Sequence, residues 1–327
     1  MSKHIPPHLR RGLKAVICTV VLLLALPLLA LAANAQDQGL FSGYTADAPM
    51  NREVPNPKGL HIFIWAGLKT HPPGRHDYPQ FLADWSKILT EHGAVVDGAL
   101  HPPSAEDLAH TDVLILYKGD AGYINDAEKK VLTDYVKRGG GFVSIHDSLC
   151  GPDPQWFADN LTGAAKKHGE INFTNPAPVS YTVVDKDSPI MEGMSDFTIY
   201  DEAFFKLTWS KLAQVHVLAT ALIVKTPWTG DYTGKVVPQI WTYERTLAGG
   251  QPARTFVWMQ GDNYSNFDNY QLQRMLLRGI AWAGKQPVDS LVDYVPPARP
   301  PFRMRGPNGA NPQGKQGGNP PESAPGQ

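Results

Sequence analysis

Short apolar runs alternate with amphipathic stretches between residues 58 and 285. The apolar runs predict strands over residues 60–65, 113–117, 141–145, 179–184, 215–224, 237–243 and 255–259. Apolar side chains at helical spacing predict helices that end near Gly93, Gly139, Leu161 and Gly284. Strands that alternate with helices are typical of βαβ units. We therefore predict one α/β domain over residues 58–285, with a doubly wound, largely parallel sheet flanked by helices.

The segments on either side of this domain have a different composition. Residues 36–57 are polar and contain scattered Pro, Asn and Gly, which predicts an extended N-terminal segment. Residues 286–327 begin as a linker and then become rich in Pro, Gly, Asn and Gln, with almost no large apolar side chains. Such a composition buries too little apolar surface to fold, so we predict a disordered tail there.

The first 35 residues have the pattern of a secretory signal. Basic residues precede an almost unbroken apolar run over residues 15–31, and an A-x-A pattern that signal peptidase cleaves ends at Ala35. An uncleaved membrane anchor is the alternative, because the run approaches the roughly 17–25 residues that span a bilayer. Pro27 and the cleavage pattern favour removal of residues 1–35. We expect a mature chain that begins near Gln36, in the periplasm or secreted, without membrane attachment.

Charge and cysteine content exclude several classes of protein. The chain has 30 Lys and Arg against 31 Asp and Glu, and the predicted signal peptide holds basic residues but no acidic one. The mature chain is therefore net acidic and has no Lys/Arg block, so we exclude nucleic acid as a partner. Of the two cysteines, Cys18 lies in the signal peptide and Cys150 remains. The mature chain can form no internal disulfide and no C-x-x-C zinc site.

Polar side chains follow the predicted strands at the ends where open α/β sheets bind ligands. They are His76 and Asp77 after the first strand, Lys118 after the second, His146 and Asp147 after the third, and Asp262 with Tyr264 after the last. Imidazole and carboxylate groups in such positions can exchange protons with a substrate. Two structural alternatives exist: Asp77 can cap the following helix, and a histidine can be a core group with satisfied hydrogen bonds. Two histidines at strand ends favour a functional site.

A series of motifs in a fixed order resembles a known family. The motifs are the His76-Asp77-Tyr78 loop and the segments RGGGFVSIH (138–146), LTGAAKKH (161–168), SPIMEGM (188–194), YDEAFFKL (200–207), PQIWTYE (238–244), FVWMQGD (256–262) and LLRGIAWA (276–283). Over roughly residues 58–285 the chain resembles the ThuA-like, or trehalose-utilisation, family. The resemblance implies a fold similar to that of class I glutamine amidotransferases, which is flavodoxin-like.

The resemblance also implies a set of site residues. It adds His168 and Glu202 to His76 and His146 as polar groups around one cleft. The family often has a histidine directly after the glycine that follows the last strand, and this chain has Asp262 in that position. We therefore include Asp262 with the two histidines at strand ends, His168 and Glu202 as candidate catalytic residues.

Family membership further implies a substrate class. The family is tied to carbohydrate use, which implies processing of oxidised disaccharides or glycosides such as 3-keto sugars. The expected partner is then a small-molecule carbohydrate. Aromatic side chains stack well on sugar rings, and Trp228, Tyr232 and Tyr264 lie in or beside predicted loops. We predict that these three, with Asp77, Lys118 and Asp147, contribute to substrate binding.

These observations together favour an enzyme, either a sugar isomerase or a hydrolase or lyase. A His/Glu pair would move protons at a carbon beside a carbonyl or at a glycosidic oxygen. This chemistry requires no organic cofactor. Several His with Asp or Glu would suit a divalent metal, but the sequence spacing fixes no ligand set. The oligomeric state is left open.

Two other functions compete with this one. A binding protein could hold a sugar in the same cleft without chemistry, although it has no need of several titratable groups together. A thiol hydrolase would use Cys150, because glutamine amidotransferases place a cysteine on a tight turn after a strand. That turn usually has glycines two residues before and after the cysteine, where this chain has Ser148 and Pro152. We therefore favour an inert thiol.

Overall fold

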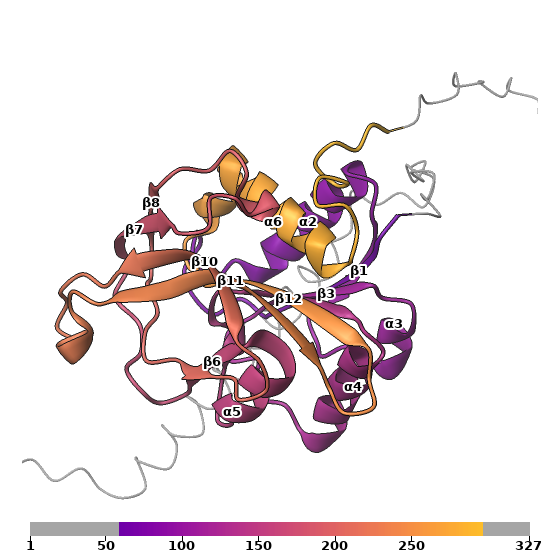
Figure 1. Ribbon diagram of the computed structural model, residues 1–327, viewed down its shortest axis with the longest axis horizontal. Coiled ribbons are helices and arrows are strands. Elements are labelled where there is room, and N and C mark those ends of the chain that lie inside the picture. The colour runs from indigo at the N-terminus through magenta and orange to yellow at the C-terminus, as the bar shows by residue number, and fades with distance from the viewer. Residues whose placement is uncertain (1–58, 297–327) are drawn as a thin grey trace, which may run out of the picture. The chain divides into compact units, whose positions relative to one another are not determined.

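The computed structural model describes residues 59–296 (Figure 1). These residues belong to the compact unit that begins at Asn56. The predicted signal peptide, the segment 36–57 and the tail from residue 297 onward lie outside the described residues. Between residues 59 and 296, no helix is long and apolar enough to span a membrane.

A nine-stranded sheet in the order β2-β1-β3-β4-β12-β11-β10-β7-β8 forms the centre of the domain. Its first five strands are parallel: β2 (Val95–Ala99), β1 (His61–Ala66), β3 (Val113–Tyr117), β4 (Gly141–Ile145) and β12 (Pro252–Trp258). Strands β3 and β4 are buried along their whole length, as parallel strands covered on both faces are. This half of the sheet confirms the predicted doubly wound α/β fold.

The other half of the sheet is antiparallel and corrects the expectation of a largely parallel sheet. It consists of β11 (Val236–Thr246), β10 (Val215–Leu222), β7 (Ala177–Val183) and β8 (Phe197–Asp201). Only five residues connect β11 to β12, whereas a parallel crossover needs about a dozen or more. The loop length therefore imposes the antiparallel pairing.

Helices cover both faces of the sheet (Figure 1). One core contains α2 (Tyr78–Glu91) and α6 (Tyr270–Ala283), and the other contains α3 (Ala105–Ala109), α4 (Asp126–Lys137) and α5 (Pro154–Phe157). Along β1 the side chains alternate between the cores, with Ile62 and Ile64 in the first and Phe63 and Trp65 in the second. The alternation follows from the two-residue repeat of a strand.

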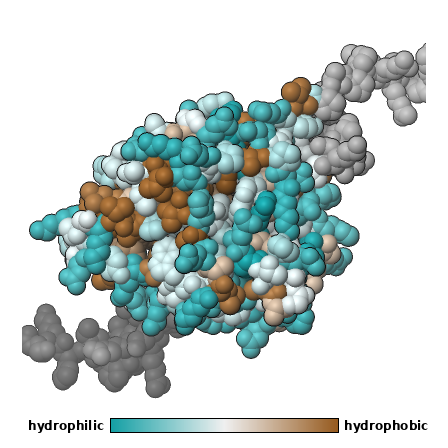
Figure 2. Space-filling view, viewed as in Figure 1, coloured by the Kyte–Doolittle hydropathy of each residue, from teal (hydrophilic) through white to brown (hydrophobic). Residues whose placement is uncertain are grey.

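The antiparallel half has one face that is open to solvent. Burial alternates along β7, where every second side chain from Val179 to Val183 is buried. Figure 2 shows apolar side chains gathered over this part of the molecule. Exposed apolar residues of these strands include Tyr200, Leu222 and Val236. One face of this half thus packs on the core and the other contacts water.

Smaller elements complete the domain. A three-stranded sheet contains β5 (Cys150–Gly151), β6 (Ala164–Lys167) and β9 (Thr208–Trp209), and single turns form η1 (His146–Leu149), η2 (Ala158–Thr162), η3 (Pro189–Met191), η4 (Gly230–Tyr232) and η5 (Tyr264–Asp268). The helix predicted to reach Leu161 is α5 continued by η2, a π-helical turn. The sequence pattern did not predict β2, β5, β6, β8, β9 and α3, which are short or partly exposed.

The folded domain extends beyond the predicted boundary at residue 285. Leu291 is buried among the residues of the α2 and α6 core, and its carbonyl oxygen lies 2.6 Å from His92 Nδ1. Arg278 Nε donates a hydrogen bond of 2.6 Å to Asp289 Oδ1. Residues 286–293, which the composition assigned to a linker, therefore pack on the domain.

Candidate active site

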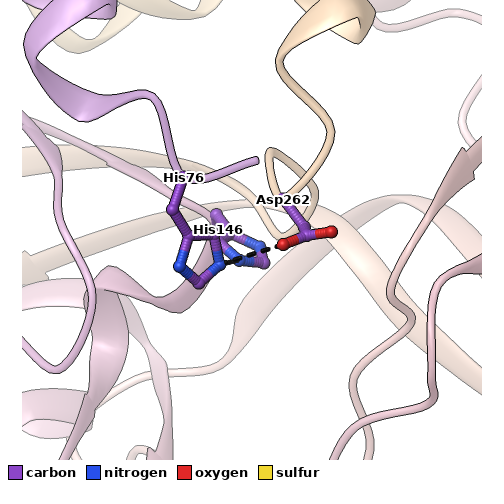
Figure 3. A group of neighbouring side chains, drawn as sticks. All are labelled: His76, His146 and Asp262. Atoms are coloured by element: carbon purple, nitrogen blue, oxygen red, sulfur yellow. Dashed lines mark hydrogen bonds and ion pairs between the residues drawn. The ribbon is translucent and has the colours of Figure 1, made fainter. Parts of the chain in front are cut away.

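Three predicted site residues meet at the carboxyl edge of the parallel strands. His76 lies in the loop after β1, His146 directly follows β4, and Asp262 follows β12 (Figure 3). His76 Nε2 lies 2.9 Å from His146 Nε2 and 3.1 Å from Asp262 Oδ1. All three side chains are buried. We call these three residues the histidine-aspartate group.

The backbone at this group adopts unusual conformations. His76 and His146 have φ angles of 47° and 56°, in the left-handed region that non-glycine residues rarely adopt. Such residues cost about 1–3 kcal/mol each and concentrate at functional sites. Gly261, with φ of 143°, precedes Asp262, and a Cβ atom there would lie 3.1 Å from the Cβ atom of His146. A glycine therefore lets the loop after β12 approach the histidines closely.

Each imidazole has a second contact through its other nitrogen. His146 Nδ1 lies 3.3 Å from the carbonyl oxygen of Met259, and His76 Nδ1 lies 3.2 Å from Thr70 Oγ1. A carbonyl oxygen can only accept, so the proton of neutral His146 belongs on Nδ1. Its Nε2 then presents a lone pair to His76 and Asp262.

Arg75 links the histidine-aspartate group to Glu202. Its Nε donates to Asp262 Oδ2 at 2.7 Å, and one terminal nitrogen of its guanidinium lies 3.4 Å from Glu202 Oε1. The side chain of Glu202 is 13% exposed, so this carboxyl group lies at the margin of the buried group. The structure thus connects Glu202 to the site as the resemblance implied. Arg75 was not predicted, although its position next to His76 is a signal in the sequence.

Asp201 holds the loop that carries Asp262. Its fully buried carboxylate accepts hydrogen bonds from the main-chain N–H groups of Gly261 at 3.1 Å and Asn263 at 3.2 Å, and from Asn266 Nδ2 at 2.7 Å. Burial raises the pKa of Asp201 to about 7, although several of these hydrogen bonds oppose the shift. Sequence reasoning missed this residue, because its partners lie about sixty positions away.

Burial also changes the protonation of the site residues. Burial, and then the charge of Asp262, raises the pKa of Glu202 to about 8. Burial and the neighbouring His76 lower the pKa of His146 well below its usual value, so its imidazole is neutral. Burial opposes ionisation of Asp262, but hydrogen bonds from His76 and Arg75 outweigh it and lower its pKa. The site therefore combines a neutral imidazole, a carboxylate and a carboxyl group that titrates near neutral pH.

The pKa of Glu202 predicts a pH dependence of stability. Glu202 loses its proton near pH 4.5 in the unfolded chain and near pH 8 in the folded chain. Between these values the folded state binds more protons, so the free energy of unfolding falls as the pH rises. In EDTA-containing buffer, we expect the wild type to lose up to about 1 kcal/mol per pH unit more than Glu202→Gln between pH 5 and 8. Urea unfolding measures this difference, and equal slopes for both proteins would contradict the raised pKa.

His168 lies in a second group instead of joining His76 and His146. Its Nδ1 is 2.9 Å from Asp120 Oδ1, and together with the Cys150 sulfur these donor atoms lie within 4.8 Å of one another. Among the described residues His168 contacts neither His76 nor His146, so its part in a common site stays a prediction. It follows β6, a strand of the small sheet, and not a strand of the main parallel sheet.

Burial, and then the charge of Asp147, raises the pKa of Cys150, which disfavours a reactive thiolate.

The predicted polar binding residues already have partners. Asp147 Oδ1 accepts from the buried Lys166 Nζ at 2.6 Å, and Lys118 Nζ donates to the carbonyl oxygen of Gly119 at 2.9 Å. Asp77 pairs with Lys69. The side chain of Asp77 does not cap α2, so the capping alternative is wrong. Lys166 was not predicted, and its ammonium lies 3.6 Å from the ring centroid of Phe204.

The three aromatic residues predicted to bind substrate, Trp228, Tyr232 and Tyr264, each pack against a different neighbour. Trp228 is 43% exposed and packs edge-on against Phe173. Tyr232 stacks on Phe205. Tyr264 donates a hydrogen bond of 2.7 Å to Asp84 and lines a cavity of about 220 Å³ between α2 and η5, which is distinct from the histidine-aspartate group. Trp228 is therefore the most exposed of the three.

The sequence matches the family model described as "ThuA: Trehalose utilisation" over residues 63–283. The chain therefore belongs to the ThuA, or trehalose-utilisation, family, as its motifs indicate. No curated protein matches the chain significantly.

Several solved structures are similar to the chain at low sequence identity. A ThuA-like protein from Bacteroides uniformis is 16% identical with a TM-score of 0.48, and the match covers 75% of this chain and 95% of that chain. A GMP synthase component from Thermoplasma acidophilum is 12% identical with a TM-score of 0.39, covering 67% and 92%. A β-galactosidase from Rahnella sp. R3 is 15% identical with a TM-score of 0.44, covering 70% of this chain and 32% of that chain.

Proposed function

We propose that the chain is a carbohydrate-processing enzyme in which Glu202 moves a proton on a sugar held beside His76 and His146. The observation that carries this proposal is the environment of Glu202. Its carboxyl group has a pKa of about 8, is 13% exposed, and is joined through Arg75 to the buried histidine-aspartate group. A general acid or base is most effective when its pKa lies near the working pH.

The substrate class that fits this group is an oxidised disaccharide or glycoside, such as a 3-keto sugar. A keto group acidifies the hydrogen on the neighbouring carbon, so a carboxylate can remove that proton without an organic cofactor. The electron pair of the C–H bond moves toward the carbonyl oxygen, which gains negative charge. Transfer of the neighbouring hydroxyl proton to the former carbonyl oxygen, with return of the removed proton to the former carbonyl carbon, gives an isomer. Expulsion of the glycosidic oxygen from the next carbon, with protonation of that oxygen by the carboxyl group, gives cleavage. Membership of the trehalose-utilisation family supports a sugar substrate.

The decisive test is incubation of the purified mature chain with a panel of disaccharides and their 3-keto forms. NMR of the products in D₂O reports deuterium incorporation at the carbon beside the carbonyl, isomerisation and cleavage separately. Exchange or product formation with a keto sugar supports the proposal. Saturable binding of a sugar without exchange or products would instead identify a binding protein.

We also infer that the chain is exported. The basic start, the apolar run over residues 15–31 and the A-x-A pattern support a cleaved signal peptide. We expect protein recovered from its host to begin near Gln36 and to occur in a periplasmic or secreted fraction. Mass spectrometry of the N-terminus measures this, and an intact N-terminus in the membrane fraction would reject it.

A further inference from the structure

The histidine-aspartate group has the composition of a metal site. His76 Nε2, His146 Nε2 and Asp262 Oδ1 all lie within 4.8 Å of one another, on buried side chains. They come from three loops, after β1, β4 and β12, so the main sheet fixes their relative positions. Two imidazoles and one carboxylate with open positions form a common ligand set for divalent transition metals.

The protein's own protons cannot satisfy these three atoms. The Nδ1 proton of His146 faces the Met259 carbonyl oxygen, which leaves its Nε2 as an acceptor. Asp262 Oδ1 is a buried acceptor, and its nearest donor atom among the described residues is His76 Nε2 at 3.1 Å, which also faces His146 Nε2. A single proton on His76 Nε2 could satisfy one of these two acceptors. A buried acceptor without a partner costs about 1–3 kcal/mol, whereas a bound cation would satisfy all three atoms.

The surroundings also match those of metal ligands. The Nδ1 atoms of both histidines contact oxygen atoms, of Met259 and Thr70, and the other oxygen of Asp262 accepts from Arg75. Contacts of this kind orient metal ligands and fix the histidine tautomer. The left-handed φ angles of His76 and His146 also support a functional site, because strained backbone is retained where function requires it.

We propose that His76, His146 and Asp262 bind one divalent transition-metal ion through the two Nε2 atoms and Oδ1. Nitrogen donors favour ions such as Zn²⁺, Mn²⁺, Co²⁺ or Fe²⁺ over Mg²⁺ and Ca²⁺, which prefer oxygen ligands. A bound ion would polarise a sugar carbonyl oxygen next to Glu202. This role in turnover rests on the proposed function, whereas metal binding itself does not.

Metal binding can be measured without any activity assay. The full chain is stripped with EDTA, dialysed, and titrated with Zn²⁺ and Co²⁺ by calorimetry, with the visible absorption of Co²⁺ as a second readout. We expect one ion per chain and a rise in the thermal midpoint on binding. His146→Gln and Asp262→Asn should each weaken binding by at least about 10–100-fold and abolish this rise.

His168→Gln provides the matched control, because it alters an imidazole of the second group. It should bind the ion as the wild type does. Loss of binding in His168→Gln with normal binding in His146→Gln would show that the ion binds at the second group, which contains His168. That result would overturn the proposal. Circular dichroism of each metal-free variant separates lost ligands from lost folding.

The outcomes for metal and for activity are distinguishable. A wild type that binds no ion but converts a keto sugar overturns the metal site and leaves the proposed function standing. A wild type that binds one ion through His146 and Asp262 but converts no sugar supports the metal site and rejects the function.

Discussion

Replacement of Glu202 by Gln is expected to lower turnover of the keto sugar by about 10²–10⁴-fold. The amide has nearly the same shape as the carboxyl group but cannot take up and release the proton. Its oxygen can still face Arg75, which lies 3.4 Å from Glu202 Oε1, so the site should keep its geometry. The change should therefore appear in kcat, with KM close to the wild type. The substrate identified by the NMR panel serves for this measurement.

Glu244→Gln is the matched control for this experiment. Glu244 is 61% exposed and pairs with Arg254 at 3.3 Å on the outer part of β11. The same chemical change there should leave turnover unaltered. Full activity per folded molecule in Glu202→Gln would show that Glu202 does not transfer the proton. An equal loss in both variants would point to a general effect of the substitution.

The meeting of His76, His146 and Asp262 was predictable because it depends on topology. Each follows a strand of the parallel half, and parallel strands with buried, apolar sequences are recognisable from their pattern. Their carboxyl ends must lie at one edge of the sheet. The prediction therefore does not depend on how far apart these three residues are in the sequence.

Residues whose roles depend on irregular contacts were not predictable in this way. Arg75 reaches Asp262 through the folding of a long loop, and Asp201 reaches the loop after β12 across the sheet. His168 was expected in the first group, but it follows a strand of the small sheet that the sequence pattern did not indicate. Strands of two to four residues carry too little periodicity to be recognised.

The antiparallel half of the sheet illustrates a further limit. The pattern located β7, β10, β11 and β12 correctly, but strand direction is set by the connections between strands. The five residues between β11 and β12 are too few for a parallel crossover. The length of the connecting loop therefore indicates whether neighbouring strands are parallel or antiparallel. Apolar periodicity indicates where the strands lie but not their direction.

Replacement of Asp201 by Ala is expected to lower the free energy of unfolding by about 3–5 kcal/mol. The fully buried carboxylate accepts from the main chain of Gly261 and Asn263 and from the side chain of Asn266. Alanine would leave these buried donors without their acceptor and would create a cavity. For a domain of this size, each kcal/mol shifts the thermal midpoint by about 2–4 °C, so we expect a decrease of about 6–20 °C.

The same substitution should also disturb the site, because Asp201 positions the loop that carries Asp262. Asp201→Asn keeps the volume and one acceptor oxygen, so its loss of stability should be smaller. Asp134→Ala is the control: Asp134 is 56% exposed on α4, and its loss should change the free energy by no more than about 0.5 kcal/mol. Urea and thermal unfolding of the three variants measure these differences. An Asp201→Ala variant as stable as Asp134→Ala would show that other groups hold the loop after β12, because the donors would then have found new partners.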